Sequence, residues 1–361
     1  MPRPPDLSDA AAALSEREQD VLRRVVQHFI DTAAPVGSKA VADRVELSSA
    51  SIRATMQRLE QAGYLGHPHT SAGRVPTEQG YRLYVDDLMD VAGLSPREAD
   101  LLRESVRRRL GDLDAVARDT SRVLGRLSRL LGVVLTPRLS TGVLDRIEVV
   151  PIGAARVLFV LALRGGLART VTAELDVEVG PRALDAVVQR LNERLAGHTL
   201  EEIRRTGAER VQDLADDDRT GVVRVVLREG PALFQEAAPE RRAAIGGAQH
   251  LVSQPEFNRP ELVRDVVELA ESEEVVVHLL ERPALLDPRQ PDRAVVLIGG
   301  EVERGPSAAA EGPAYSVVTA PYRVGDAVGA VAVIGPTRMD YARAVVLVEH
   351  VAGLLGDPPA D

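Results

Sequence analysis

The 361-residue sequence contains no cysteine and no tryptophan, and aromatic residues make up only 3% of it. Without cysteine the chain has no disulfide, no thiolate metal ligand and no cysteine nucleophile, which suits a reducing cytoplasm. With so few aromatic residues, the core must be built mainly from valine, leucine, alanine and isoleucine. These absences exclude the disulfide-rich secreted proteins and the enzymes that depend on a reactive thiol.

Long apolar runs are also missing from the sequence. The longest, such as VLFVLAL from Val157, are far shorter than the roughly 20 residues that a membrane-spanning helix needs. No N-terminal stretch pairs a basic start with an apolar core, so no signal peptide is expected. We therefore expect a cytoplasmic protein with no membrane partner.

The charge of the chain is acidic overall but locally basic. The formal net charge is −10, which by itself argues weakly against nucleic-acid binding. The segment from Ser48 to Arg82, however, contains four arginines and two glutamates, and Lys39 is the single lysine of the chain. Arginine keeps its charge and can donate two parallel hydrogen bonds to phosphate or guanine. A local DNA-binding surface is therefore compatible with the acidic total.

Three helices are predicted near the N-terminus. Ser15 and Glu18 form a Ser-x-x-Glu capping box, which predicts a helix that ends before Pro35. A short second helix begins at Ser38, and a third begins near Ser49. Their close spacing indicates a small helical domain.

The third helix has an apolar face and a polar face. Ile52, Met56 and Leu59 recur at positions i, i+4 and i+7, so they form the stripe expected to be buried. The opposite face is small and polar, has no acid at its centre, and consists of Ala50, Arg53, Ala54, Gln57 and Gln61, with Arg58 at its edge. Gly63 ends the helix as a C-terminal cap.

A β-hairpin is predicted directly after this helix, with Arg74 on its second strand, and Thr77 caps a further helix to about Met89. The order helix, helix, turn, helix and hairpin is that of a winged helix-turn-helix. Its third helix can enter the major groove of DNA while the hairpin reaches the neighbouring phosphates or minor groove. This order predicts a DNA-binding domain over residues 8–92.

The rest of the chain has an α/β pattern with an irregular middle. Two long helical patterns and several strand-like runs precede a charged, irregular stretch, and more strands and a final helix follow it. We predict an α+β multidomain fold in which residues 95–196 and 255–356 form one α/β domain and residues 197–254 form an insertion. The GPTRMDY run from Gly335 is interpreted as a strand-to-helix junction with a local Arg338–Asp340 ion pair.

Motifs spread over nearly the whole chain resemble those of one known family. They are LSEREQDVLRRVV from Leu14, PVGSKAVADRVELSSASIR from Pro35, LEQAGYL from Leu59, HTSAGRVPTEQGYRLYVDDLM from His69, GGAQHLVSQPEF from Gly246, IGGE from Ile298 and GPTRMDY from Gly335. In this order they resemble the HrcA family of heat-inducible transcription repressors.

The resemblance implies a cytoplasmic bacterial repressor of chaperone operons that binds an inverted-repeat DNA operator as a homodimer. It implies a winged-helix domain, a GAF-like domain and an inserted dimerisation domain. It further implies inactivation by heat and recovery with the help of a GroEL-type chaperonin. The family commonly has Thr-Ile-Arg-Asn where this chain has Ser51 to Ala54. Ser51 keeps the hydroxyl, whereas Ala54 lacks an amide that could contact adenine or phosphate.

Candidate DNA contacts follow from the residue pattern together with the resemblance. The set consists of Ser38, Lys39, Ser49, Ser51, Arg53, Gln57, Arg58, His69, Ser71 and Arg74. Arg53 is the first candidate for a base or phosphate contact. Structural alternatives stay open for others: Ser38 and Ser49, like Ser48, as helix caps, Arg58 as a partner of Glu60 or a side chain that packs its apolar stem, and Arg74 as a turn-stabilising donor.

No metal, cofactor or catalytic site is predicted. His67 and His69 lack a third ligand nearby, and Gly246-Gly247 and Gly299-Gly300 lack the strand-GxGxxG-helix context of a nucleotide site. No Ser-His-Asp order, paired catalytic carboxylates or P-loop is found, so an enzyme is not expected. The alternative function is a winged-helix regulator whose GAF-like domain binds a small molecule.

Overall fold

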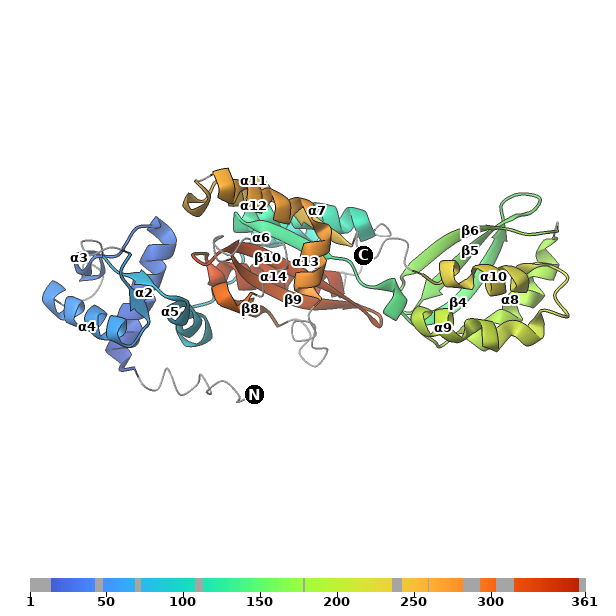
Figure 1. The fold of residues 1–361 in the computed structure, drawn as a ribbon, viewed down its shortest axis with the longest axis horizontal. Helices are drawn as coiled ribbons and strands as arrows, with labels where there is room; N and C mark the ends of the chain where they lie inside the picture. Colours follow the sequence, from blue (N-terminus) through green and yellow to red (C-terminus); the bar gives the residue numbers. More distant parts are fainter. Residues whose placement is uncertain are drawn as a thin grey trace.

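The computed structural model describes residues 14–42, 48–68, 73–107, 113–177, 179–235, 242–258, 260–281, 293–302 and 315–356. The chain is a mixed α/β structure with three parts arranged along its long axis: a head at the N-terminal end, a central domain, and an end unit (Figure 1). One hydrophobic core runs through the head and the central domain, and a second lies in the end unit. Within the described ranges, every helix is too short or too polar to cross a lipid bilayer.

The head contains the predicted helices and hairpin. Its elements are α2 (Glu16–Thr32), α3 (Ser38–Ala42), α4 (Ser49–Gln61), β1 (Leu65–Gly66), β2 (Val75–Pro76) and α5 (Glu78–Leu83), followed by a π-helical turn, η1 (Tyr84–Leu88). Strands β1 and β2 pair antiparallel. The predicted capping box is confirmed, because the Ser15 hydroxyl accepts from the Glu18 N–H while the Glu18 carboxylate accepts from the Ser15 N–H at 3.0 Å. Thr77 caps α5 as predicted.

A five-stranded antiparallel sheet forms the central domain, in the order β7-β3-β10-β9-β8. Its strands are β3 (Leu131–Leu135), β7 (Ala243–Gly246), β8 (Val295–Leu297), β9 (Tyr315–Val324) and β10 (Ala327–Pro336). Its helices are α6 (Pro96–Arg107), α7 (Leu113–Ser128), α11 (Ala248–Val252), α12 (Pro260–Glu271), α13 (Glu273–Leu280) and α14 (Tyr341–Gly356), with short 3-10 turns at Pro255–Phe257 and Gly299–Glu301. Helix α7 packs on β3 and β7, and α14 packs on β9 and β10.

The end unit is the segment inserted between β3 and β7. It consists of a 3-10 turn at Leu139–Thr141, β4 (Leu144–Pro151), β5 (Arg156–Leu163), β6 (Ala168–Glu174), α8 (Pro181–Leu195), α9 (Leu200–Val211), a 3-10 turn at Gln212–Leu214, and α10 (Val222–Leu233). The strands form a separate antiparallel sheet, β4-β5-β6, over the second core.

The insertion therefore begins well before the predicted boundary at 197. Val133 of β3 pairs with Ile245 of β7. The chain therefore leaves the central sheet after β3 and re-enters it as β7, the strand beside β3. The strand pattern of residues 144–174 suggested a continuation of the α/β domain. Sheet membership depends on the pairing partner, however, and the pattern of a single strand does not reveal that partner.

One glutamate holds both ends of the insertion. The Arg138 guanidinium donates to Glu281 at 2.9 Å, and Arg242, which is only 5% exposed, forms an ion pair with the same carboxylate. Arg242 also donates to the Thr136 carbonyl at 2.9 Å. The two segments that connect the central sheet to the end unit are thus bonded to each other and to the residue that follows α13.

Helix α5 attaches the head to the central domain. The Arg82 guanidinium donates to the Glu301 carboxylate at 3.0 Å and to the Val296 carbonyl at 2.8 Å. The ring of Tyr81 lies against that of Tyr341, with centroids 5.7 Å apart. Burial raises the pKa of both tyrosines far above the ordinary value, so these rings are neutral at physiological pH.

Arg338 of the GPTRMDY run also contacts the head. The predicted local pair with Asp340 is wrong: Arg338 donates to Glu256 at 2.6 Å and to the Ile30 carbonyl in the last turn of α2. Carbonyls in that turn lack helical partners, and a cation satisfies them well. Asp340 instead accepts from the Arg343 N–H at 3.0 Å. The strand-to-helix junction therefore links the central domain to the head.

Replacing Phe159 with alanine tests the second core. Phe159 is 1% exposed, and Phe→Ala in a core costs about 3–5 kcal/mol. We expect the Phe159→Ala variant to lose about that much unfolding free energy in urea denaturation. The control Glu209→Ala, at an exposed position of α9, should change it by less than about 0.5 kcal/mol. Equal effects of the two changes would contradict a separate core in the end unit.

Candidate nucleic-acid interface

The orientation of α4 is set by its buried face. The Ser48 hydroxyl caps the helix by accepting from the Ser51 N–H at 3.2 Å. Ile52 and Leu59 are completely buried and Met56 nearly so, and they belong to the core shared with α2. The predicted stripe is confirmed. Burial of these side chains leaves α4 with a single outward face.

That outward face is open to solvent. Arg53, Ala54, Gln57 and Arg58 are all exposed. In Figure 1, α3 and α4 lie at the end of the head away from the central domain, while α5 lies toward it. Within the part of the chain that the structure describes, no hydrogen bond or ion pair occupies the Arg53 side chain. Its five N–H donors are therefore available to a ligand.

Arg58 has a partner that the sequence pattern did not indicate. Its guanidinium donates to Glu18 on α2 at 2.7 Å and to Thr55 at 3.3 Å, and Glu60 is not its partner. The hydrogen bond from Arg58, together with those from Ser15, lowers the pKa of Glu18 from 4.5 to about 2. Arg58 therefore joins α4 to the start of α2, although 53% of its side chain remains exposed.

Arg17 is a cation of this face that sequence reasoning missed. It is exposed on the first turn of α2, and its guanidinium donates to the Ser51 hydroxyl. The sequence offered no signal for this proximity, because the two residues lie on different helices and meet only through packing. Arg17 thereby adds a positive charge beside the N-terminal end of α4.

The start of α3 lies next to the start of α4. The Ser38 and Ser49 hydroxyls are 3.0 Å apart, and each serine is the first residue of its helix. Ser48, and not Ser49, is the cap of α4. Lys39 is exposed on α3. The structure thus brings Ser38, Lys39 and Ser49 to one side of the head.

In the hairpin, Arg74 is bound within the head. Its guanidinium lies 2.8 Å from Glu60, and its backbone exchanges two hydrogen bonds with Val36. His67 lies 3.2 Å from the same carboxylate. This arrangement matches the alternative in which Arg74 stabilises the turn. Of the other hairpin candidates, His69 and Ser71 lie outside the described residues.

Taken together, the exposed cations and amide surround one free helix face beside a two-stranded hairpin. Arg17, Lys39 and Arg53 are exposed there, and Gln57 adds an amide that can both donate and accept. Such a face can donate hydrogen bonds to phosphate oxygens and base edges. This fold and site are typical of the transcription regulators that act through DNA.

Comparison with known proteins identifies the family. The HrcA protein C terminal domain matches residues 114–345. The chain is 39% identical over 347 residues to the heat-inducible transcription repressor HrcA of Chlorobium phaeobacteroides (strain BS1), covering 95% of this chain and 97% of that protein. The protein of the same name from Prosthecochloris aestuarii (strain DSM 271 / SK 413) is 38% identical over 355 residues, covering 96% and 98% of the two chains. The chain belongs to the HrcA family.

A solved structure has the same general fold. It is described as a hypothetical protein at 2.2 Å resolution, and it matches with a TM-score of 0.59 and 22% sequence identity. The match covers 95% of this chain and 98% of the other. At this identity the likeness concerns the fold alone, and it extends over nearly the full length of both chains.

The Arg58–Glu18 contact can be measured by NMR titration of the Glu18 carboxyl group. We expect a pKa near 2 in the native protein and a shift toward 4.5 in Arg58→Ala. Because folding lowers this pKa, the carboxylate stabilises the head above pH 4.5, and that stabilisation is lost as the pH falls toward 2. Arg53→Ala is the matched control and should leave the titration unchanged. An unaltered Glu18 titration in Arg58→Ala would show that this contact is absent in solution.

Proposed function

We propose that the chain is a negative regulator of heat-shock (chaperone) operons that binds an inverted-repeat operator as a homodimer. The observation that carries the proposal is the exposed polar face of α4, on which Arg53 has no partner within the described residues. Membership of the HrcA family supports the regulatory role. Repression then follows from occupancy of the operator.

The head acts as a winged helix-turn-helix in this proposal. Helix α4 enters the major groove, where Arg53 and Gln57 reach base edges. Lys39 and Arg17 lie at the flanks and bind phosphates, with Ser38, Ser49 and Ser51 as short polar donors between them. Arg58 contributes positive charge while it remains tied to Glu18. Arg74 has a structural role in the hairpin.

The proposed dimer contact lies on the end unit, which replaces residues 197–254 as the dimerisation domain. Helices α8 and α10 pack on β4 and β6. Along β5, Phe159 and its alternate neighbours are buried in the core, so Leu158, Val160 and Ala162 lie on the opposite face. Val150, 43% exposed, pairs with Leu158 on that face. The ion-paired Arg146 and Glu148 lie opposite Ala162 and Val160 on the same face. A second copy would cover the apolar residues of this face, and its two-fold symmetry would match an inverted repeat.

Heat release follows from the way the head is attached. The head and the central domain, which we assign as GAF-like, share one hydrophobic core, so loosening of either part affects the other. Association also stabilises each folded protomer, and a protomer that dissociates from the dimer loses that stabilisation. Heating would therefore change the spacing of the two heads or their folded fraction. A GroEL-type chaperonin that assists refolding is the partner this mechanism needs.

Arg53→Ala tests the DNA contact. If Arg53 binds a base, the variant should bind a duplex of the upstream inverted repeat about 1–3 kcal/mol more weakly in fluorescence anisotropy. A phosphate contact would instead weaken binding to all sequences and reduce the salt slope by about 1. Arg97→Ala, an exposed arginine of α6, is the matched control. Unchanged operator affinity in Arg53→Ala would refute this role of α4.

Val160→Arg tests the dimer contact. An arginine in the middle of the outer face of β5 should disfavour association, because its long side chain and the Glu148 carboxylate opposite it would both have to be desolvated between the protomers. Sedimentation velocity is expected to show monomers at concentrations where the native protein is dimeric. Arg205→Glu, an exposed site on α9, should remain dimeric. A Val160→Arg protein that stays dimeric would place the interface elsewhere.

A further inference from the structure

The covalent connection between the head and the central domain has no regular secondary structure. Residues 89–95 join η1 to α6 without forming a helix or strand, and residues 90–93 are exposed. Irregular, exposed segments are more mobile than the elements they connect, so this one does not fix a direction by itself. We call the contacts between the head and the central domain the joint. The direction of the head, and therefore of α4, depends on them.

A single arginine from the GPTRMDY run occupies one side of the joint. The side chain of Arg338 is only 11% exposed, and its guanidinium contacts both parts of the molecule. In the central domain, Nε and Nη2 donate to the two carboxylate oxygens of Glu256 at 2.6 and 3.2 Å, and Nη2 also donates to the Gln254 amide oxygen at 3.0 Å. Nη1 donates to the Ile30 carbonyl of the head. Because the guanidinium is planar, fixing it on one side fixes the carbonyl on the other.

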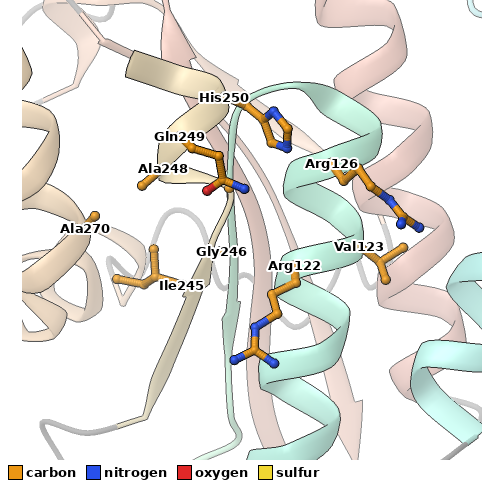
Figure 2. A pocket seen from close by; sticks show the side chains of 10 residues that line it. Arg122, Val123, Arg126, Ile245, Gly246, Ala248, Gln249, His250 and Ala270 are labelled. Atoms are coloured by element: carbon orange, nitrogen blue, oxygen red, sulfur yellow. The ribbon is translucent and has the colours of Figure 1, made fainter. Parts of the chain in front are cut away.

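The central-domain partners of Arg338 belong to the GGAQHLVSQPEF run, which is held at both ends. Figure 2 shows its start, where β7 ends at Gly246 beside α7 and the chain continues into α11. A Cβ atom on Gly246 would lie 2.7 Å from a backbone nitrogen of α7, so the run rests directly on that helix. At its other end, the Gln254 amide donates to the Arg129 carbonyl at 3.2 Å, and the buried Phe257 ring stacks on Tyr315. The run therefore supports Arg338 rigidly.

On the head side, α2 transmits the contact to α4. Ile30 lies in the last turn of α2. The first turn of the same helix is bonded to α4 through the pair of Glu18 and Arg58. The two helices also pack against each other in one core. Helices α2 and α4 therefore move as one body, and the contact at Ile30 sets the direction in which α4 projects from the central domain.

We infer that Arg338 is a positioning residue for operator recognition, because it fixes the angle of the head on the central domain. In the dimer proposed above, on which this role depends, two heads held at fixed angles match one half-site spacing. Heads free to turn on residues 89–95 match several spacings, and each loses conformational entropy when DNA orders it. Arg338 thus determines which spacing of the inverted repeat is bound, without contacting DNA.

The first test measures the spacing preference by fluorescence anisotropy. The duplexes carry the upstream inverted repeat at its natural spacing, the repeat lengthened by about two base pairs, which rotates one half-site by roughly 70° around the duplex, or a single half-site. The native protein should bind the natural spacing at least about tenfold more tightly than the altered one. In Arg338→Ala this ratio should fall below about threefold, with single half-site affinity within about twofold of native. Loss of folded protein would weaken binding to every duplex equally, so the ratio reports on geometry.

Two further variants separate positioning from folding. Arg343 donates to Glu98 and to the Leu127 carbonyl, partners of the same kinds but inside the central domain, so Arg343→Ala should keep the native ratio. Arg338→Lys keeps the charge beside Glu256 but loses the planar fork, and it should give an intermediate ratio. A native ratio in Arg338→Ala, or the same fall in Arg343→Ala, would overturn the role of Arg338. A native protein that binds none of the duplexes would contradict the proposed function as well.

The second test needs no DNA. The chain contains no cysteine, so spin labels attach only at introduced ones, such as Gln61→Cys in the head and Glu268→Cys in the central domain, both at exposed positions. Pulsed electron paramagnetic resonance should give one narrow distance distribution for the otherwise native protein and for Arg343→Ala. It should give a broader distribution for Arg338→Ala. An unchanged distribution in Arg338→Ala would overturn the role of Arg338 and leave the proposed function standing.

Discussion

Burial of one face of α4 against the core of the head determines what the molecule can present to a partner. Ile52 and Leu59 are completely buried, so the helix cannot rotate about its axis without exposing them. Arg53 and Gln57 are consequently held outward on a rigid element, where their direction is set by packing and not by their own contacts. Preorganisation of this kind reduces the conformational entropy lost on binding.

The head is attached to the central domain by contacts of two different kinds. Polar contacts, such as Glu78 to the Gly300 N–H at 3.1 Å and Arg82 to Glu301, are partly exposed, and exposed pairs contribute little stability each. The rings of Tyr81 and Tyr341, which pack against each other at an interplanar angle of 54°, belong to the continuous core. The polar contacts therefore orient the head, while the shared core couples its stability to that of the central sheet.

The candidate site could be predicted from the sequence only where the signals are local. The cap at Ser48 and the buried stripe of α4 follow from residues within two or three turns of each other, and the structure has both. The partners of Arg58, Arg74 and Arg338 could not be predicted in this way, because each ion pair joins segments that meet through tertiary packing. Arg17 was missed for the same reason.

The sequence by itself determined the helices of the head, the hairpin after α4, and the motifs that place the chain in its family, because these depend on neighbouring residues and on residue identity. Only the tertiary structure decided that β3 and β7 are neighbours, that residues 144–174 form a separate sheet, and that the Gly246-Gly247 turn lies against α7. Strand pairing and close backbone approach join residues far apart along the chain. A periodic pattern records which face of a strand or helix is buried, but not which element covers it.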